Sequence, residues 1–99
     1  MTKNNLARIL SIDFGKKRTG LAVSDPLQII ANSLEAIPTK EIFNFIKKYC
    51  AQEEVSCFVV GFPYKHGVGE NEIIKHIEKF IAELNRLYAD KPVFKVDES

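Results

Sequence analysis

The chain has 99 residues and a formal net charge of +1, with 45% apolar and 27% charged residues. This length allows one domain, and the near-average composition excludes a disordered or collagen-like chain. The near-zero charge removes the simplest sign of a nucleic-acid binder, a strongly basic domain, but leaves room for a local basic patch. No apolar run approaches the ~20 residues of a membrane helix. We read no signal peptide, and the two cysteines favour a reducing cytoplasm.

The first part of the chain predicts three strands. Apolar and β-branched residues favour a buried strand over 6–14, and residues 19–24 are typical of a second strand. The turn over 15–18 is short enough for these two strands to form a hairpin. Residues 29–37 are expected to form a third strand, which would complete an antiparallel meander.

The rest of the chain alternates helices with strands. Apolar residues at helical spacing predict helices over 40–52, with Thr39 as N-cap, and over 71–88. Between them, residues 56–62 form a continuously apolar run that is typical of a strand buried on both faces. Residues 93–96 are expected to form the last strand. Such alternation implies right-handed parallel crossovers.

The order β-β-β-α-β-α-β predicts a single α/β domain over residues 1–99, with one mixed sheet and helices packed on it. In this arrangement the first, fourth and fifth strands are parallel, so their carboxyl ends share one edge of the sheet. Ligands bind at that edge in open α/β folds. We therefore expect the functional residues where these three strands end.

Acidic residues stand at the ends of two of these strands. Asp13 closes the first strand, and Asp97 and Glu98 close the fifth. Carboxylates held close together repel one another unless a cation lies between them, and Mg²⁺ prefers a few carboxylates with water and phosphate oxygens. The pattern favours a metal site suited to phosphodiester hydrolysis. The alternative is that these acids merely end strands beside turns.

Cationic residues follow the first of these acids. Lys16, Lys17 and Arg18 occupy the turn, where they could hold phosphates beside a metal. Lys65, in the loop after the fourth strand, could add a further phosphate contact. A solvated hairpin turn is the alternative interpretation from charge alone.

Three segments resemble motifs of the YqgF/RuvX family. Residues 12–26, which read IDFGKKRTGLAVSDP, resemble its N-terminal signature. Residues 59–63, VVGFP, resemble its strand-end motif, and residues 96–99, VDES, resemble the start of its Asp-Glu-Arg segment. The three matches fall in order across essentially the whole chain.

The resemblance implies a ribonuclease H-like fold and a nuclease that uses Mg²⁺ or Mn²⁺. The activity it implies is resolution of Holliday junctions or maturation of the 5′ end of pre-16S rRNA in ribosome biogenesis. Asp13 would be the central catalytic metal ligand, with Glu98 and Asp97 as further acidic ligands. The cations of the 15–18 turn would then face phosphates of structured DNA or precursor rRNA.

The chain also departs from the family pattern. Members continue through a helical region that carries another acidic residue of the site, which we expect the domain over 1–99 to lack. Ser99 stands where an arginine is common. The alternative function is therefore a catalytically incomplete nucleic-acid-binding or ribosome-assembly module. Sheet surface left uncovered by a missing helix would favour self-association as a homodimer.

Overall fold

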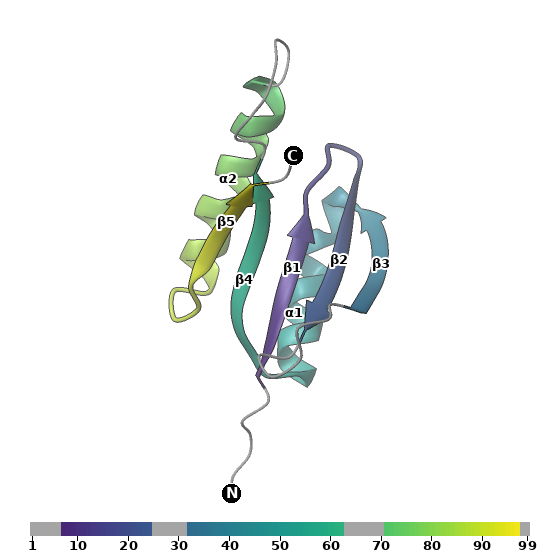
Figure 1. Cartoon of the computed structure of the whole chain (residues 1–99), viewed down its shortest axis with the longest axis vertical. Helices are drawn as coiled ribbons and strands as arrows, with labels where there is room; N and C mark the ends of the chain where they lie inside the picture. The colour runs from purple at the N-terminus through teal and green to yellow at the C-terminus, as the bar shows by residue number, and fades with distance from the viewer. Residues whose placement is uncertain (1–6, 25–31, 63–70, 98–99) are drawn as a thin grey trace, which may run out of the picture.

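The computed structural model describes residues 7–24, 32–62 and 71–97 (Figure 1). Its elements follow the predicted order, with a single 3₁₀ turn added before the first helix. They are β1 (Arg8–Asp13), β2 (Arg18–Ser24), β3 (Asn32–Pro38), η1 (Thr39–Glu41), α1 (Ile42–Gln52), β4 (Val55–Phe62), α2 (Asn71–Leu87) and β5 (Val93–Asp97). None of the described helices is long and apolar enough to span a membrane.

The five strands form one mixed sheet in the order β3-β2-β1-β4-β5. The β1–β2 and β2–β3 pairs are antiparallel, whereas β1–β4 and β4–β5 are parallel. This confirms the predicted α/β fold with a mixed sheet. The carboxyl ends of β1, β4 and β5 therefore lie at one edge, as expected, with β4 between the other two strands.

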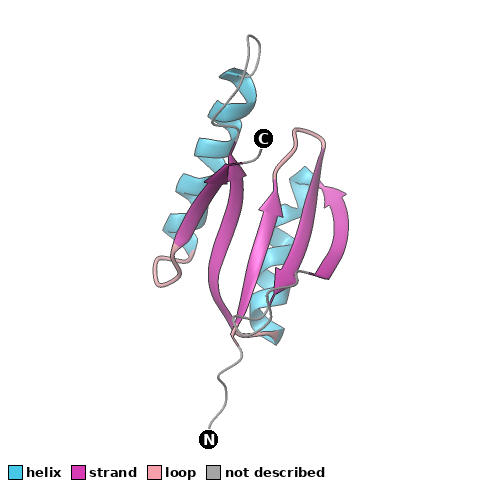
Figure 2. Ribbon diagram, in the orientation of Figure 1, coloured by secondary structure: helices cyan, strands magenta, loops and turns pink. Residues whose placement is uncertain are grey.

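Both helices cover the same face of the sheet (Figure 2). Strand side chains alternate between faces, so Leu10 and Ile12 of β1 point into the core while Ser11 and Asp13 belong to the other face. Apolar residues of α1 and α2 complete the core on the helix side. The buried apolar residues are Leu10, Ile12, Leu21, Val23, Ile37, Ile42, Ile46, Val55, Phe58, Val60, Phe62, Ile77, Phe80, Ile81 and Leu84.

The second face of the sheet is uncovered by any described helix, and its β5 end is apolar. Phe94 lies beside Val59, and Val96 lies beside Gly61. The Phe94 and Val96 residues are 52% and 44% exposed. Uncovered apolar sheet surface was predicted from the sequence; its use in a homodimer stays a prediction.

The start of the first helix differs from the prediction. Thr39 was expected to be the N-cap, but it opens the 3₁₀ turn and no side chain caps that turn. The Thr39 hydroxyl instead donates to the Gly15 carbonyl oxygen at 2.6 Å, and its N–H donates to the Lys17 carbonyl at 2.8 Å. The Thr39 side chain is thus committed to the β1–β2 turn, and α1 begins three residues later, at Ile42.

Candidate functional site

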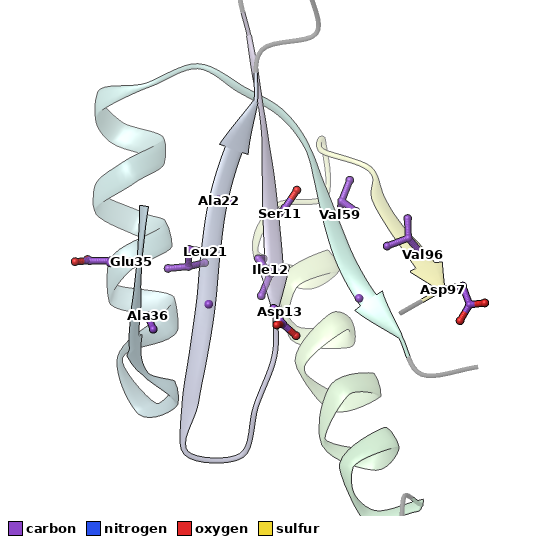
Figure 3. Close-up of a pocket in the computed structure, with 12 residues that line it drawn as sticks. Ser11, Ile12, Asp13, Leu21, Ala22, Glu35, Ala36, Val59, Val96 and Asp97 are labelled. Atoms are coloured by element: carbon purple, nitrogen blue, oxygen red, sulfur yellow. The ribbon is translucent and has the colours of Figure 1, made fainter. Parts of the chain in front are cut away.

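A groove of about 530 Å³ opens on the uncovered face of the sheet (Figure 3). All five strands contribute to its lining, and small residues hollow it: Gly20 and Ala22 from β2, Ala36 from β3 and Gly61 from β4. Its volume is within the ~300–1,000 Å³ typical of ligand pockets. Asp13, Glu35 and Asp97 are acidic residues of its lining, and Figure 3 shows the Glu35 and Asp97 side chains pointing away from Asp13. The groove therefore includes the edge where the sequence predicted a site.

Asp13 is the last residue of β1, the central strand. It pairs with Gly20 of β2, and because the parallel register runs from Ile12 beside Val60, its nearest neighbour in β4 is Gly61. Glycine on both sides leaves open space around the Asp13 side chain, which is exposed. Its carboxylate makes no hydrogen bond or ion pair with any residue the structure describes. It is a hard oxygen donor without a protein partner in that part of the chain.

Asp97 ends β5 and lines the same groove. Strand β4 separates it from Asp13, so the two backbones are roughly 10 Å apart at about 4.8 Å per strand. Figure 3 shows the Asp97 side chain pointing away from Asp13. Within the described ranges, no cluster of three His, Cys, Asp or Glu side chains is arranged to hold a metal. Glu98 lies outside those ranges, so shared cation binding by the three acids stays a prediction.

The cations of the β1–β2 turn differ in their engagement. Lys16 Nζ pairs with Glu72 Oε1 of α2 at 3.3 Å, although both side chains are more than half exposed. Arg18 Nη2 donates to the Ala36 carbonyl oxygen of β3 at 2.6 Å. Lys17 is exposed and has no side-chain partner among the described residues. Lys65 lies outside the described ranges. Lys17 is thus the turn cation with the fewest protein contacts.

Neutral hydrogen bonds hold the β1–β2 turn in place. The Thr39 hydroxyl proton goes to the Gly15 carbonyl, so Thr19 Oγ1 donates in the 2.8 Å bond between the two hydroxyls. Thr19 is fully buried. A Cβ at Gly15 would meet the Arg18 carbonyl oxygen at 2.3 Å, so the close approach of the chain requires glycine there. These contacts fix the backbone of the turn that carries the cations.

Sequence reasoning missed two features of this region. The Thr19–Thr39 hydrogen bond joins residues 20 positions apart, whereas the local sequence predicted Thr39 as the N-cap of the first helix. Glu35 lines the groove from β3, the edge strand. The antiparallel register of β3 with β2 places Glu35 beside Leu21, and only knowledge of that register could have located it.

The comparisons with known proteins agree with this fold. A family model described as RuvX, Holliday junction resolvase, matches residues 7–99. A protein of Bacteroides thetaiotaomicron is 45% identical over 93 residues, which are 94% of this chain and 67% of that protein. Proteins of Phocaeicola vulgatus and Porphyromonas gingivalis are 46% and 41% identical over the same shares.

All three relatives carry the description "Putative pre-16S rRNA nuclease". The match spans nearly the whole chain and about two thirds of each relative. It confirms the resemblance found in the motifs and the predicted enzyme class, a nuclease. The chain therefore belongs to the RuvX family.

Proposed function

We propose that this chain forms the metal-binding core of an endonuclease that hydrolyses phosphodiester bonds in structured nucleic acid in the cytoplasm. The observation that carries the proposal is Asp13. Its carboxylate ends the central strand, faces an open groove and has no partner among the described residues. A carboxylate that serves only structure normally accepts hydrogen bonds or pairs with a cation, whereas a metal ligand must keep its oxygens available.

The donor set fits a hard divalent cation. Carboxylate oxygens suit Mg²⁺ or Mn²⁺, and Asp13 would be the central ligand, with Glu98 and Asp97 as the other acids. Because strand side chains alternate, Asp97 belongs to the opposite face of β5 from Val96, which shares the face of Asp13. Glu98 lies outside the described residues, and its role as the partner of Asp13 rests on the family resemblance. When bound, the metal supplies an activated water and stabilises the leaving oxygen.

The basic turn would position the substrate. Phosphate contacts fix the register of a nucleic acid without reading its sequence, and Lys17 has its ammonium available for such a contact. Lys16 can exchange its exposed pair with Glu72 for a phosphate, because exposed ion pairs contribute only ~0–1 kcal/mol. Arg18, the first residue of β2, would act from the place where the Ala36 carbonyl of β3 holds its guanidinium, and Lys65 would add a contact from the segment that follows β4.

Two substrates follow from the descriptions of the family and of its relatives, and the test uses both. A four-way DNA junction and a precursor of the 16S rRNA 5′ end are each incubated with the chain in Mg²⁺ or Mn²⁺. Asp13→Asn is expected to lower cleavage by about 100-fold or more, because it removes a charged ligand of the metal. Asp90→Asn, which changes an exposed aspartate in the turn before β5, is the matched control and is expected to cleave as the parent does.

Calorimetric titration with Mn²⁺ separates metal binding from catalysis. The parent and Asp90→Asn are expected to bind the ion, and Asp13→Asn to bind it at least about tenfold more weakly. Cleavage by Asp13→Asn at the parent's rate, or unchanged Mn²⁺ affinity, would contradict the proposed ligand role.

A second candidate function is a non-catalytic nucleic-acid-binding or ribosome-assembly module. The separation of Asp13 from Asp97 by β4 favours it. This candidate predicts binding of the same nucleic acids in EDTA without cleavage in any metal. It also predicts a steep salt dependence that flattens when Lys16, Lys17 and Arg18 are replaced by glutamine. Metal-dependent cleavage by the parent chain would exclude it.

A further inference from the structure

A second groove, of about 390 Å³, lies on the helix side of the molecule. It is bounded by Thr39 and Lys40 of η1, the first residues of α1, and one face of α2 around His76 and Lys79. Phe14, the residue directly after Asp13, lines it as well. This helix-side groove is separate from the groove that contains Asp13 and plays no part in the function proposed above.

Aromatic rings line the helix-side groove. Phe80 lies between Phe14 and Phe43, with centroids 5.3 Å from each and interplanar angles of 34° and 45°. Phe80 is buried, whereas Phe14 and Phe43 are only half-buried. The exposed parts of these two rings offer an apolar surface of the kind on which nucleic-acid bases stack.

Cations surround this aromatic surface. Lys40 and Lys79 are exposed and form no ion pair with any residue in the described ranges. The acid of the groove, Glu83, is already engaged, because Arg86 donates to both its oxygens at 3.1 and 2.5 Å. This hydrogen bonding lowers the pKa of Glu83 and keeps it ionised. The groove therefore presents positive charge to a ligand, with the exposed His76 imidazole as a further hydrogen-bonding group.

The helix-side groove lies next to the carboxylate edge, because the consecutive residues Asp13 and Phe14 line the two grooves. Asp13 belongs to the open face, while the next residue, Phe14, packs against the core on the helix side. The turn that carries Lys16 and Lys17 lies between the two grooves. Lys16 also contacts Glu72, one helical turn before His76 on α2. A nucleic-acid strand that leaves Asp13 and crosses this turn would reach the aromatic surface.

We infer that the helix-side groove binds an unpaired nucleotide of the nucleic acid whose backbone crosses the basic turn. The base stacks on Phe14 and Phe43, and the adjoining phosphates contact Lys40 and Lys79. A nucleotide supplies both the flat ring and the negative charge that this lining requires, whereas an apolar peptide side chain supplies no charge. The inference rests on the proposed function for the identity of the nucleic acid.

The test measures binding in EDTA, so that the metal site does not affect it. A labelled single-stranded RNA of about eight nucleotides is compared with an abasic phosphodiester chain of equal length and charge. The parent is expected to bind the RNA about five- to tenfold more tightly than the abasic chain, in keeping with one or two stacked bases. Phe43→Leu is expected to remove most of this difference.

Matched variants on the same helices serve as controls. Phe45→Leu changes another half-buried ring of α1, one that stacks on Tyr49, and is expected to keep the preference for RNA. Lys79→Gln is expected to lower the salt slope of RNA binding by about 0.7, whereas Lys75→Gln, elsewhere on α2, is expected to leave it unchanged. Thermal melts followed by circular dichroism show whether each variant is folded.

Photo-crosslinking with a 5-iodouridine oligomer gives a second measurement on the parent chain. Crosslinks to Phe14, Phe43 or His76 would support the inference. Equal binding of RNA and abasic chain, an RNA preference retained by Phe43→Leu, or crosslinks confined to the open sheet face would overturn it. Binding of free adenosine monophosphate without binding of the oligomer would also overturn it. None of these outcomes depends on Asp13, so loss of the proposed nuclease function would be recognised separately.

Discussion

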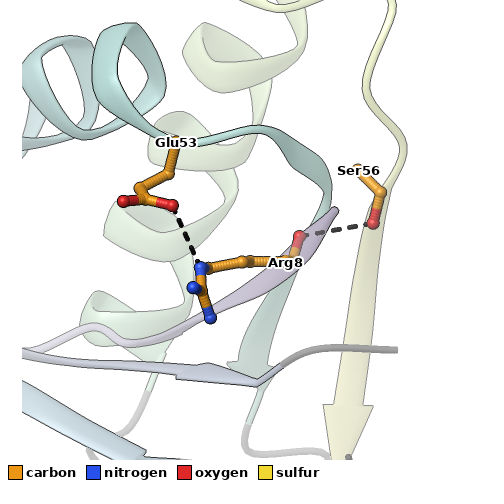
Figure 4. A network of polar contacts seen from close by, with 3 residues as sticks. All are labelled: Arg8, Glu53 and Ser56. Carbon is orange, nitrogen blue, oxygen red and sulfur yellow. Dashed lines mark hydrogen bonds and ion pairs between the residues drawn. The ribbon is translucent and has the colours of Figure 1, made fainter. Parts of the chain in front are cut away.

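The charged groups at the two ends of the parallel strands differ in whether they have protein partners. At the amino end, Arg8 Nε pairs with Glu53 Oε1 at 3.2 Å, and Ser56 Oγ donates to the Arg8 carbonyl at 3.3 Å (Figure 4). Lys91 Nζ donates to the Val55 carbonyl at 2.9 Å. At the carboxyl end, Asp13 and Lys17 have no such partners among the described residues. The charged groups of the amino end serve the structure, whereas the carboxyl end leaves Asp13 and Lys17 available to a ligand.

The carboxyl end obtains its rigidity from neutral groups instead. The hydroxyls of Thr19 and Thr39, together with the Gly15 backbone, fix the β1–β2 turn without engaging the side chains of Asp13 or Lys17. If ion pairs held the turn, their carboxylates would compete with phosphates for the same cations. Substitutions at the two ends should therefore differ in what they change: stability alone at the amino end, and the shape of the site at the carboxyl end.

Gly15→Ala should have the largest effect on stability. The new Cβ would lie 2.3 Å from the Arg18 carbonyl oxygen, so the turn must shift, at a cost of about 1–3 kcal/mol. Gly20→Ala is the matched control, because its Cβ would meet only the Asp13 Cβ, at an ordinary 3.7 Å. Urea unfolding of both variants measures the difference. Equal stability of the two would show that the turn is not tightly constrained at Gly15.

Thr19→Val should have an intermediate effect. The substitution preserves the shape of a fully buried side chain but removes the hydroxyl that bonds to Thr39, which costs about 1 kcal/mol. Because the turn loosens, nucleic-acid affinity should fall as well. Ser56→Ala removes a hydroxyl contact at the amino end, where the group is exposed, and should change neither quantity appreciably. Urea unfolding and RNA titration of both variants test the contrast between the ends.

Much of the fold was predictable because local pattern and topology agree. The period-two and helical patterns identified the strands and helices, and the alternation of helices with strands in the second half of the chain identified the parallel crossovers. The start of α1 was not predictable, because the Thr39 hydroxyl donates to the Gly15 carbonyl, 24 residues away in the sequence. Capping rules consider only hydrogen bonds to backbone groups a few residues away, and they therefore predicted Thr39 as an N-cap.

The candidate site was predictable in its position but not in its geometry. Asp13 at the carboxyl end of β1 follows from the strand order along the chain. The insertion of β4 between β1 and β5 does not, and it separates Asp13 from Asp97. The helix-side groove was missed because Phe14, Phe43 and Phe80 each fit an apolar pattern and were interpreted as ordinary core. Their remaining exposure depends on how α1 and α2 pack, which periodicity does not specify.

Glu53→Gln should have the smallest effect and sets the baseline for the comparison. The Arg8 and Glu53 side chains are 38% and 43% exposed, so solvent screens their attraction and the pair contributes only about 0.2–1 kcal/mol. This loss should shrink in urea unfolding experiments at high salt, since exposed charges are screened further. Metal affinity and RNA binding should stay at the parent's values. A change in either would mean that the amino end communicates with the carboxylate edge along β1, and that the two ends are not independent.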